Sequence, residues 1–114
     1  MQIIPLKEGL ELTVERAYFS VDTIGIDIDN IENYPYIMQR ASMHGDIIYN
    51  KESTNGGRHL RIRLTNEIPF LKSLVLRFDI GDDPNRILFD LQRYLKGASK
   101  NTIDILFNYK GKIC

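Results

Sequence analysis

The chain has 114 residues, of which 43% are hydrophobic and 26% are charged, and this composition is typical of one globular domain with a core of its own. Its 15 basic and 15 acidic residues cancel, which argues against a protein that coats nucleic acid through overall positive charge but allows a local basic patch. Cys114 is the one cysteine, so a disulfide framework and a cysteine zinc site are excluded. With no signal peptide or apolar run of membrane length, we expect a cytoplasmic protein that does not bind membranes.

Residues 22–29 predict the first strand. Ile26 and Ile28 alternate there with Asp27 and Asp29, which is the pattern of a strand with one apolar and one polar face. The chain then predicts a helix at 34–43, a strand at 46–52, a tight turn at Asn55-Gly56-Gly57 and a strand at 58–64.

The second half predicts two helices and a last strand. Pro69 opens a helix that ends at Ile80-Gly81, and Asp83 with Pro84 begins another that runs to about Lys96. Residues 102–109 predict the last strand. Spacing places the following side chains on the inner faces of the two helices: Leu71, Leu74, Val75 and Phe78, then Ile87, Leu91, Tyr94 and Leu95.

This order, β-α-β-β-α(α)-β, predicts an α+β fold of the ferredoxin-like or RRM-like plan, with helices on one face of an antiparallel sheet and the other face open. Its usual strand order is 4-1-3-2, so the strands at 22–29 and 58–64 become central neighbours and the last strand flanks the first. The expected core contains Ile26, Ile28, Leu60, Ile62 and Leu64 under the helices, with Phe78, Leu91 and Leu95 opposite.

Polar side chains of the two central strands then share the open face. Asp27 and Asp29 are candidate ligands of Mg²⁺ or Mn²⁺, because hard cations bind carboxylate oxygens, and Asp104 is a candidate third ligand. We assign candidate catalytic roles to Asp27, Asp29 and His59, and candidate phosphate binding to Arg58, Arg61 and Arg63. The alternative is structural: the acids and bases neutralise each other as cross-strand ion pairs on a solvated face.

A second charged group lies on the helices. Arg86 with Asp90, and Asp90 with Arg93, have the spacing of stabilising pairs on a helix surface, and this is the interpretation we favour. The alternative is a basic helix edge, including Arg77, that contacts a nucleic-acid backbone.

Two familiar classes fit poorly. A replication-initiator nuclease would need His-x-His on the central strand, but Arg61 stands where the second histidine belongs. An RNA-recognition motif would need aromatic residues on the third strand, and residues 58–64 contain none.

The pattern of Asp27-x-Asp29, with Ser53, Gly56 and His59 at the third strand, resembles the core of the archaeo-eukaryotic primase–polymerase superfamily. In that family the paired aspartates bind divalent metal, the histidine contacts nucleotide phosphates, and a later strand adds a carboxylate, for which Asp104 is the nearest match. Family enzymes carry a further N-terminal unit, so the resemblance implies a minimal or degenerate core. The stretch from Gly81 to Arg93 also resembles small uncharacterised proteins of archaeal viruses and plasmids, which would work in the host cytoplasm.

Two hypotheses follow. The first is a domain of a mobile element that binds DNA, RNA or a nucleotide through Mg²⁺ or Mn²⁺, with nucleotidyl or phosphoryl transfer as its reaction if it is an enzyme. The second is a non-enzymatic interaction module, for example a homodimer that packs through its open sheet face.

Overall fold

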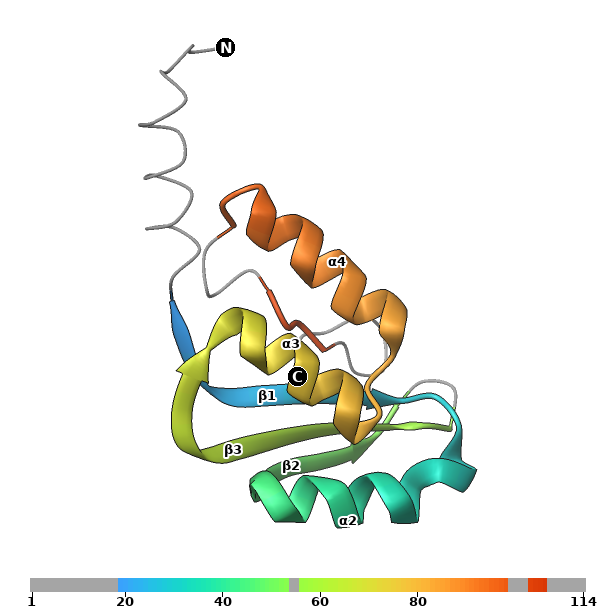
Figure 1. Ribbon diagram of the computed structural model, residues 1–114. Coiled ribbons are helices and arrows are strands. Elements are labelled where there is room, and N and C mark those ends of the chain that lie inside the picture. Colours follow the sequence, from blue (N-terminus) through green and yellow to red (C-terminus); the bar gives the residue numbers. More distant parts are fainter. Residues whose placement is uncertain (1–18, 54–55, 99–102, 107–114) are drawn as a thin grey trace, which may run out of the picture.

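The computed structural model describes residues 19–53, 56–98 and 103–106 (Figure 1). The described elements are, in chain order, β1 (Ser20–Ile28), the 3-10 turn η1 (Ile31–Asn33), α2 (Tyr34–His44), β2 (Gly45–Glu52), β3 (Arg58–Pro69), α3 (Phe70–Ile80) and α4 (Pro84–Leu95). Each predicted helix and each of the first three predicted strands is therefore present, with ends shifted by a few residues. No helix in these ranges is both long enough and apolar enough to cross a membrane.

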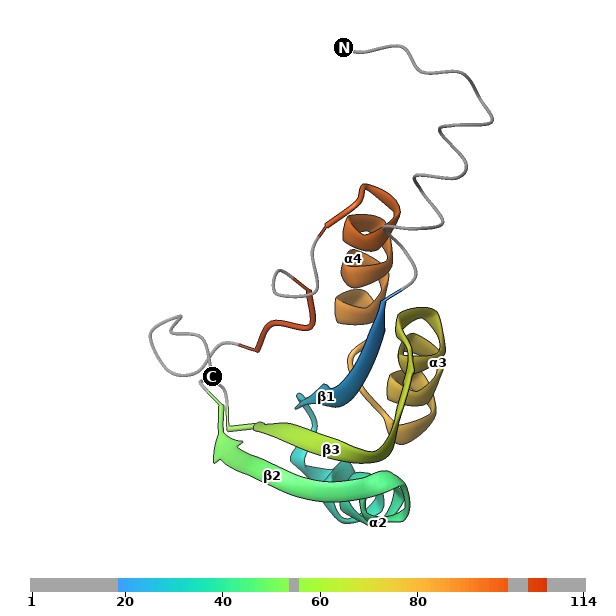
Figure 2. The same ribbon diagram turned by 90° about the vertical axis from the view of Figure 1, so that its left-hand side faces the viewer.

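The sheet is antiparallel and has the strand order β1-β3-β2. Ile26 lies opposite Leu60 and Ile24 opposite Ile62, so the apolar side chains of the two strands share one face. Helices α2 and α3 pack on that face (Figure 2). The predicted core positions on the strands are confirmed as buried: Ile26, Ile28, Leu60, Ile62 and Leu64.

The inner face of α3 differs from the predicted one. Phe70, Leu74 and Ile80 face the core together with Arg77, whereas Phe78 is 65% exposed. Leu71 and Val75, predicted on the same inner face, are exposed as well. The inward predictions for Leu71, Val75 and Phe78 were therefore wrong, because an arginine takes the position that apolar spacing assigns to a hydrophobic residue. Two buried carboxylates compensate the charge of Arg77 and make that burial tolerable.

Helix α4 lies along the free edge of β1, next to α3 (Figures 1 and 2). Tyr94 is buried against Phe19 and Phe70, and Ile87 and Leu91 pack on the rim of the core, as predicted. Leu95 points into solvent instead, with 61% of its surface exposed, so its place in the predicted core was wrong. Asp90, one turn before Tyr94, takes the buried position and binds Arg77.

The predicted fourth strand is absent from residues 103–106, which are the part of it that the structure describes. Residues 103–106 are irregular, with a positive φ of 54° at Asp104, while residues 102 and 107–109 lie outside the described ranges. The predicted strand was therefore wrong over 103–106, although this segment does lie beside β1, where the order 4-1-3-2 places it (Figures 1 and 2).

Side chains occupy the edge of β1 that a fourth strand would pair with. The Gly25 amide donates to Asp104 Oδ2 at 2.7 Å, and the Asp27 amide donates to Asp82 Oδ1 at 2.8 Å. The Gly25 carbonyl accepts from Arg86 Nη1 at 3.1 Å. An exposed strand edge is a liability that proteins cover, and here two carboxylates and a guanidinium satisfy its main-chain groups instead of a neighbouring strand.

Candidate metal and phosphate site

Asp27 and His59 form the centre of the site. They lie directly opposite each other on β1 and β3, and His59 Nε2 lies 3.4 Å from Asp27 Oδ1. This confirms the predicted shared face and adjacent strands for these two residues. The face is less open than predicted, since His59 is only 6% exposed.

Three carboxylates converge where β1 ends and α4 begins. Asp27 is the penultimate residue of β1, Asp29 follows the strand, and Asp83 caps the first turn of α4 by accepting from the Asn85 amide. One carboxylate oxygen from each of Asp27, Asp29 and Asp83 lies within 4.8 Å of the others. Carboxylate oxygens are the ligands that hard divalent cations prefer, so this cluster could hold one.

Burial and neighbouring charges shift the pKa values of Asp27 and His59. Burial, with the nearby charge of Asp29, raises the pKa of Asp27 from 3.8 to about 6, and Asp82 and Asp83 act in the same direction. Burial, with the positive charge of Arg86, lowers the pKa of His59. At neutral pH the pair is therefore a carboxylate beside a neutral imidazole.

Asp104 does not join this cluster. Its carboxylate pairs with Arg86 and lies 3.7 Å from Arg61 Nη1, while its carbonyl accepts from Arg61 Nη2 at 2.8 Å. The third carboxylate beside Asp27 and Asp29 is Asp83 instead. From the sequence, Asp83 was recognisable only as the cap of a helix. Its place beside Asp27 becomes visible only in the fold, which brings the start of α4 to the end of β1.

The three candidate phosphate ligands separate in space. Arg58 lies on the other side of the sheet from His59, over the ring of Tyr34, and donates to Asn50. Arg61 is held by Asp104, and Arg63 is exposed two positions further along β3. Of the three, Arg61 and Arg63 share the polar face with His59, and Arg58 does not.

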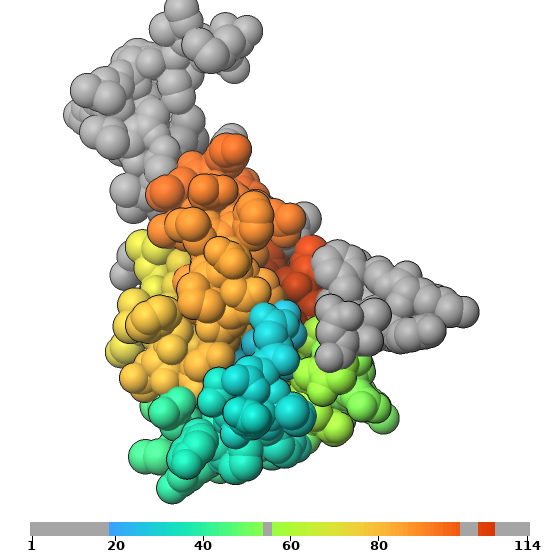
Figure 3. All heavy atoms as spheres, turned by 90° about the vertical axis from the view of Figure 1, so that its right-hand side faces the viewer, coloured from blue at the N-terminus to red at the C-terminus, as the bar shows by residue number. Residues whose placement is uncertain are grey.

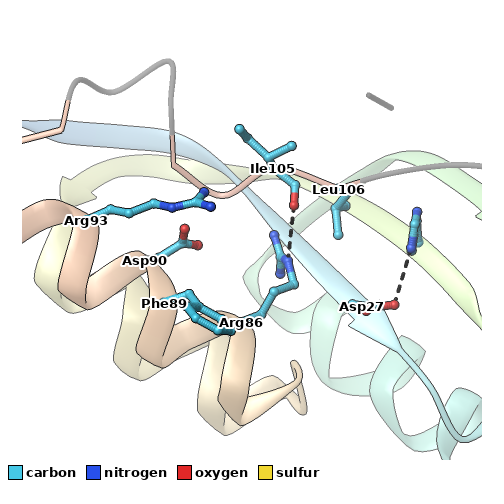
Figure 4. A pocket seen from close by; sticks show the side chains of 8 residues that line it. Asp27, Arg86, Phe89, Asp90, Arg93, Ile105 and Leu106 are labelled. Carbon is cyan, nitrogen blue, oxygen red and sulfur yellow. Dashed lines mark hydrogen bonds and ion pairs between the residues drawn. The ribbon is translucent and has the colours of Figure 1, made fainter. Parts of the chain in front are cut away.

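A hollow of about 360 Å³ lies between the polar face and α4 (Figure 4). Phe89 is 60% exposed beside it, and Arg93 extends along its rim. The lining residues are Asp27, His59, Arg86, Phe89, Asp90, Arg93, Ile105 and Leu106.

Arg86 is structural in this arrangement. It donates to the carbonyls of Gly25 and Ile105 and to the carboxylates of Asp82 and Asp104. Burial opposes its charge, but these two carboxylates outweigh burial and raise its pKa. The expected surface pair with Asp90 is therefore wrong, because Arg86 turns toward β1.

Arg77, which the sequence placed among the surface charges of the helices, is buried in the core. Its side chain is 0% exposed, and it donates to Asp82 Oδ2 and Asp90 Oδ2, both at 2.8 Å. Asp82 in turn holds the Asp27 amide. The network thus connects the core of α3 with the β1 backbone at the candidate site, and it fixes the position of Asp83 next in the chain.

Comparisons of this chain with protein-family models, with curated proteins and with solved structures found no match. Functional inference therefore depends on the chemistry of the site residues.

Proposed function

We propose that this protein binds the phosphate of a nucleotide or nucleic acid through a divalent cation, Mg²⁺ or Mn²⁺, held by Asp27, Asp29 and Asp83. The convergence of these three carboxylates within 4.8 Å is the observation that carries the proposal. Three close anions repel one another, and the raised pKa of Asp27 is the result of burial and that repulsion. A cation would relieve the repulsion and leave coordination positions for phosphate oxygens.

The adjoining hollow supplies the other contacts that a nucleotide needs. The exposed ring of Phe89 offers a surface for base stacking, and Arg93 and His59 line the same hollow as that ring and Asp27. Arg86 remains a positioning residue, because its donors already bind protein groups.

Two observations support a further proposal that the domain is a reduced ferredoxin-like core of the primase–polymerase type. The order β1-β3-β2 equals the last three strands of 4-1-3-2, and Asp27 stands directly opposite His59. In this proposal the DNA or RNA strand lies along the polar face near Arg61 and Arg63, and the cation serves nucleotidyl transfer by stabilising the attacking and leaving oxygens.

The test is a titration of a fluorescently labelled nucleoside triphosphate and a labelled oligonucleotide against the full chain, with Mn²⁺ and with chelator. We expect binding that requires Mn²⁺ and that is lost in the double variant Asp29→Asn with Asp83→Asn, since removing two carboxylate charges removes the cation. Asp27 is left unchanged in this variant to keep its contact with His59.

The matched control is Asp22→Asn with Asp46→Asn, which removes two exposed carboxylates outside the cluster. It should bind as the wild type does. If the acids only neutralise the neighbouring bases, the Asp29 and Asp83 variant will bind phosphate unchanged or more tightly. That result, or binding that persists with chelator, would refute the proposal.

A further inference from the structure

Helix α3 exposes a stripe of hydrophobic side chains. Leu71, Val75 and Phe78 follow one another at helical spacing, and Val75 is 69% exposed. The opposite positions of the same helix form the core with Arg77. Solvated helix faces are normally polar, so a continuous apolar stripe on the outer side calls for a partner.

The stripe borders α4. On the other flank of α3, Lys72 and Leu76 line a hollow with Met43 and His44 of α2, so the flank with the stripe is the one that faces α4.

Helix α4 contributes two more apolar residues on the matching side. Arg86, Phe89 and Arg93 line the hollow beside Asp27, and Leu88 and Leu95 lie on the opposite flank, where both are exposed. The two helices run side by side, and their atoms meet without a gap in the space-filling view (Figures 1 and 3). We name this surface the α3–α4 face: Leu71, Val75, Phe78, Leu88 and Leu95.

The size of the α3–α4 face fits a protein interface. The exposed fractions of these five residues amount to roughly 500 Å² of apolar surface, within the range of the largest patch on a typical monomer. A standard interface covers about 800 Å² on each partner, including a polar rim. The face with its rim therefore matches the area that one partner contributes to a stable dimer.

The pattern on α3 is complementary to itself. If two copies of α3 cross antiparallel about a twofold axis at Val75, Leu71 meets Phe78 of the second copy and the two Val75 side chains meet at the axis. Lys72 and Asp79, both exposed at the rim, then pair across the axis in both directions. We propose that a second copy of this chain docks on the α3–α4 face in this antiparallel arrangement, so the dimer forms through helices and not through the sheet.

The first test measures association of the full chain by sedimentation velocity over a range of concentrations. Val75→Glu places two like charges at the axis, and we expect it to weaken the dimer by about a hundredfold or more. Tyr36→Glu is the matched control, since Tyr36 is also a large exposed hydrophobic residue but lies on α2, away from the face and from Lys72. It should leave the dimer intact, and a monomeric wild type at all concentrations would overturn the proposal.

The second test separates a second copy from an intramolecular cover, for which residues 1–18 of the same chain are the alternative. Lys72→Glu and Asp79→Lys each place like charges across the axis, so each variant alone should dimerise more weakly than the wild type. An equimolar mixture restores two opposite-charge pairs, so it should form heterodimers with affinity near that of the wild type. Failure of the mixture to associate would refute the antiparallel arrangement.

This dimer is independent of the proposed metal site. Val75→Glu should leave Mn²⁺-dependent nucleotide binding unchanged, and Asp29→Asn with Asp83→Asn should leave dimerisation unchanged. Either proposal can therefore fail without the other.

Discussion

Replacing Asp27 by Asn should make the metal-free protein more stable at alkaline pH. The pKa of Asp27 is about 6 in the folded protein against an ordinary value of 3.8, so the folded state holds this proton more tightly than the unfolded chain. The stabilising contribution of the group is therefore fully present below pH 3.8 and is lost as pH rises through about 6. Asparagine cannot ionise, so the variant avoids that loss.

The magnitude follows from the same pKa values. Their difference corresponds to a free-energy penalty of about 3 kcal/mol on the charged carboxylate before solvent screening is considered. The Asp27 side chain keeps 20% of its surface exposed, and solvent screening reduces the expected gain to about 1–2 kcal/mol. The contact with His59 at 3.4 Å subtracts little, because the imidazole is neutral at this pH and an amide preserves the shape.

The assay is urea unfolding of the wild type and Asp27→Asn, followed by circular dichroism with chelator present. The variant should be more stable at about pH 8, and the difference should disappear well below pH 3.8, where the carboxylate is protonated in both states. Saturating Mn²⁺ should stabilise the wild type and not the variant, which would reverse their order. A variant that is equally or less stable than the wild type at about pH 8 without metal would refute the reasoning.

Three further substitutions test the framework around the site. Arg77→Met should destabilise the fold by about 3–5 kcal/mol in urea unfolding, because two buried carboxylates lose their partner; a loss below about 1 kcal/mol would mean that Arg77 is not buried as described. Gly25→Ala should cost about 1–3 kcal/mol, since the new methyl group would lie 2.7 Å from Asp104 Oδ1, and an unchanged melting temperature would exclude that close approach. Ile62→Asp should abolish folding while Arg61→Ala costs about 1 kcal/mol, and equal melting temperatures for these two variants would show that the faces of β3 are reversed.

The sequence was sufficient to predict the strands whose apolar and polar residues alternate and the helices whose ends carry clear signals. β1 and β3 were predictable because Ile26, Ile28, Leu60 and Ile62 alternate with polar residues, and the register that places Asp27 opposite His59 follows from the expected strand order. The beginning of α4 was predictable because an aspartate followed by proline is a helix start.

The remaining features depend on tertiary ion pairs, which local spacing does not reveal. Arg77 is buried only because Asp82 and Asp90 reach it. Because Arg77 faces the core, α3 is oriented so that Phe78 faces solvent. Asp104 was expected on a strand, but its carboxylate binds the edge of β1 and the arginines instead. The candidate metal ligands changed in the same way, since Asp83 comes close to Asp27 where the neighbouring Asp82 holds the Asp27 amide.

The most direct test of the metal-dependent binding proposal is a crystal of the full chain soaked with Mn²⁺ and a non-hydrolysable nucleoside triphosphate, measured for anomalous scattering. We predict one strong manganese peak within about 2.5 Å of carboxylate oxygens from Asp27, Asp29 and Asp83, with phosphate oxygens on its open side and the base near Phe89. A crystal that is soaked at a saturating concentration of Mn²⁺ but shows no manganese at these three carboxylates would contradict the proposal. A nucleotide bound elsewhere would also contradict it.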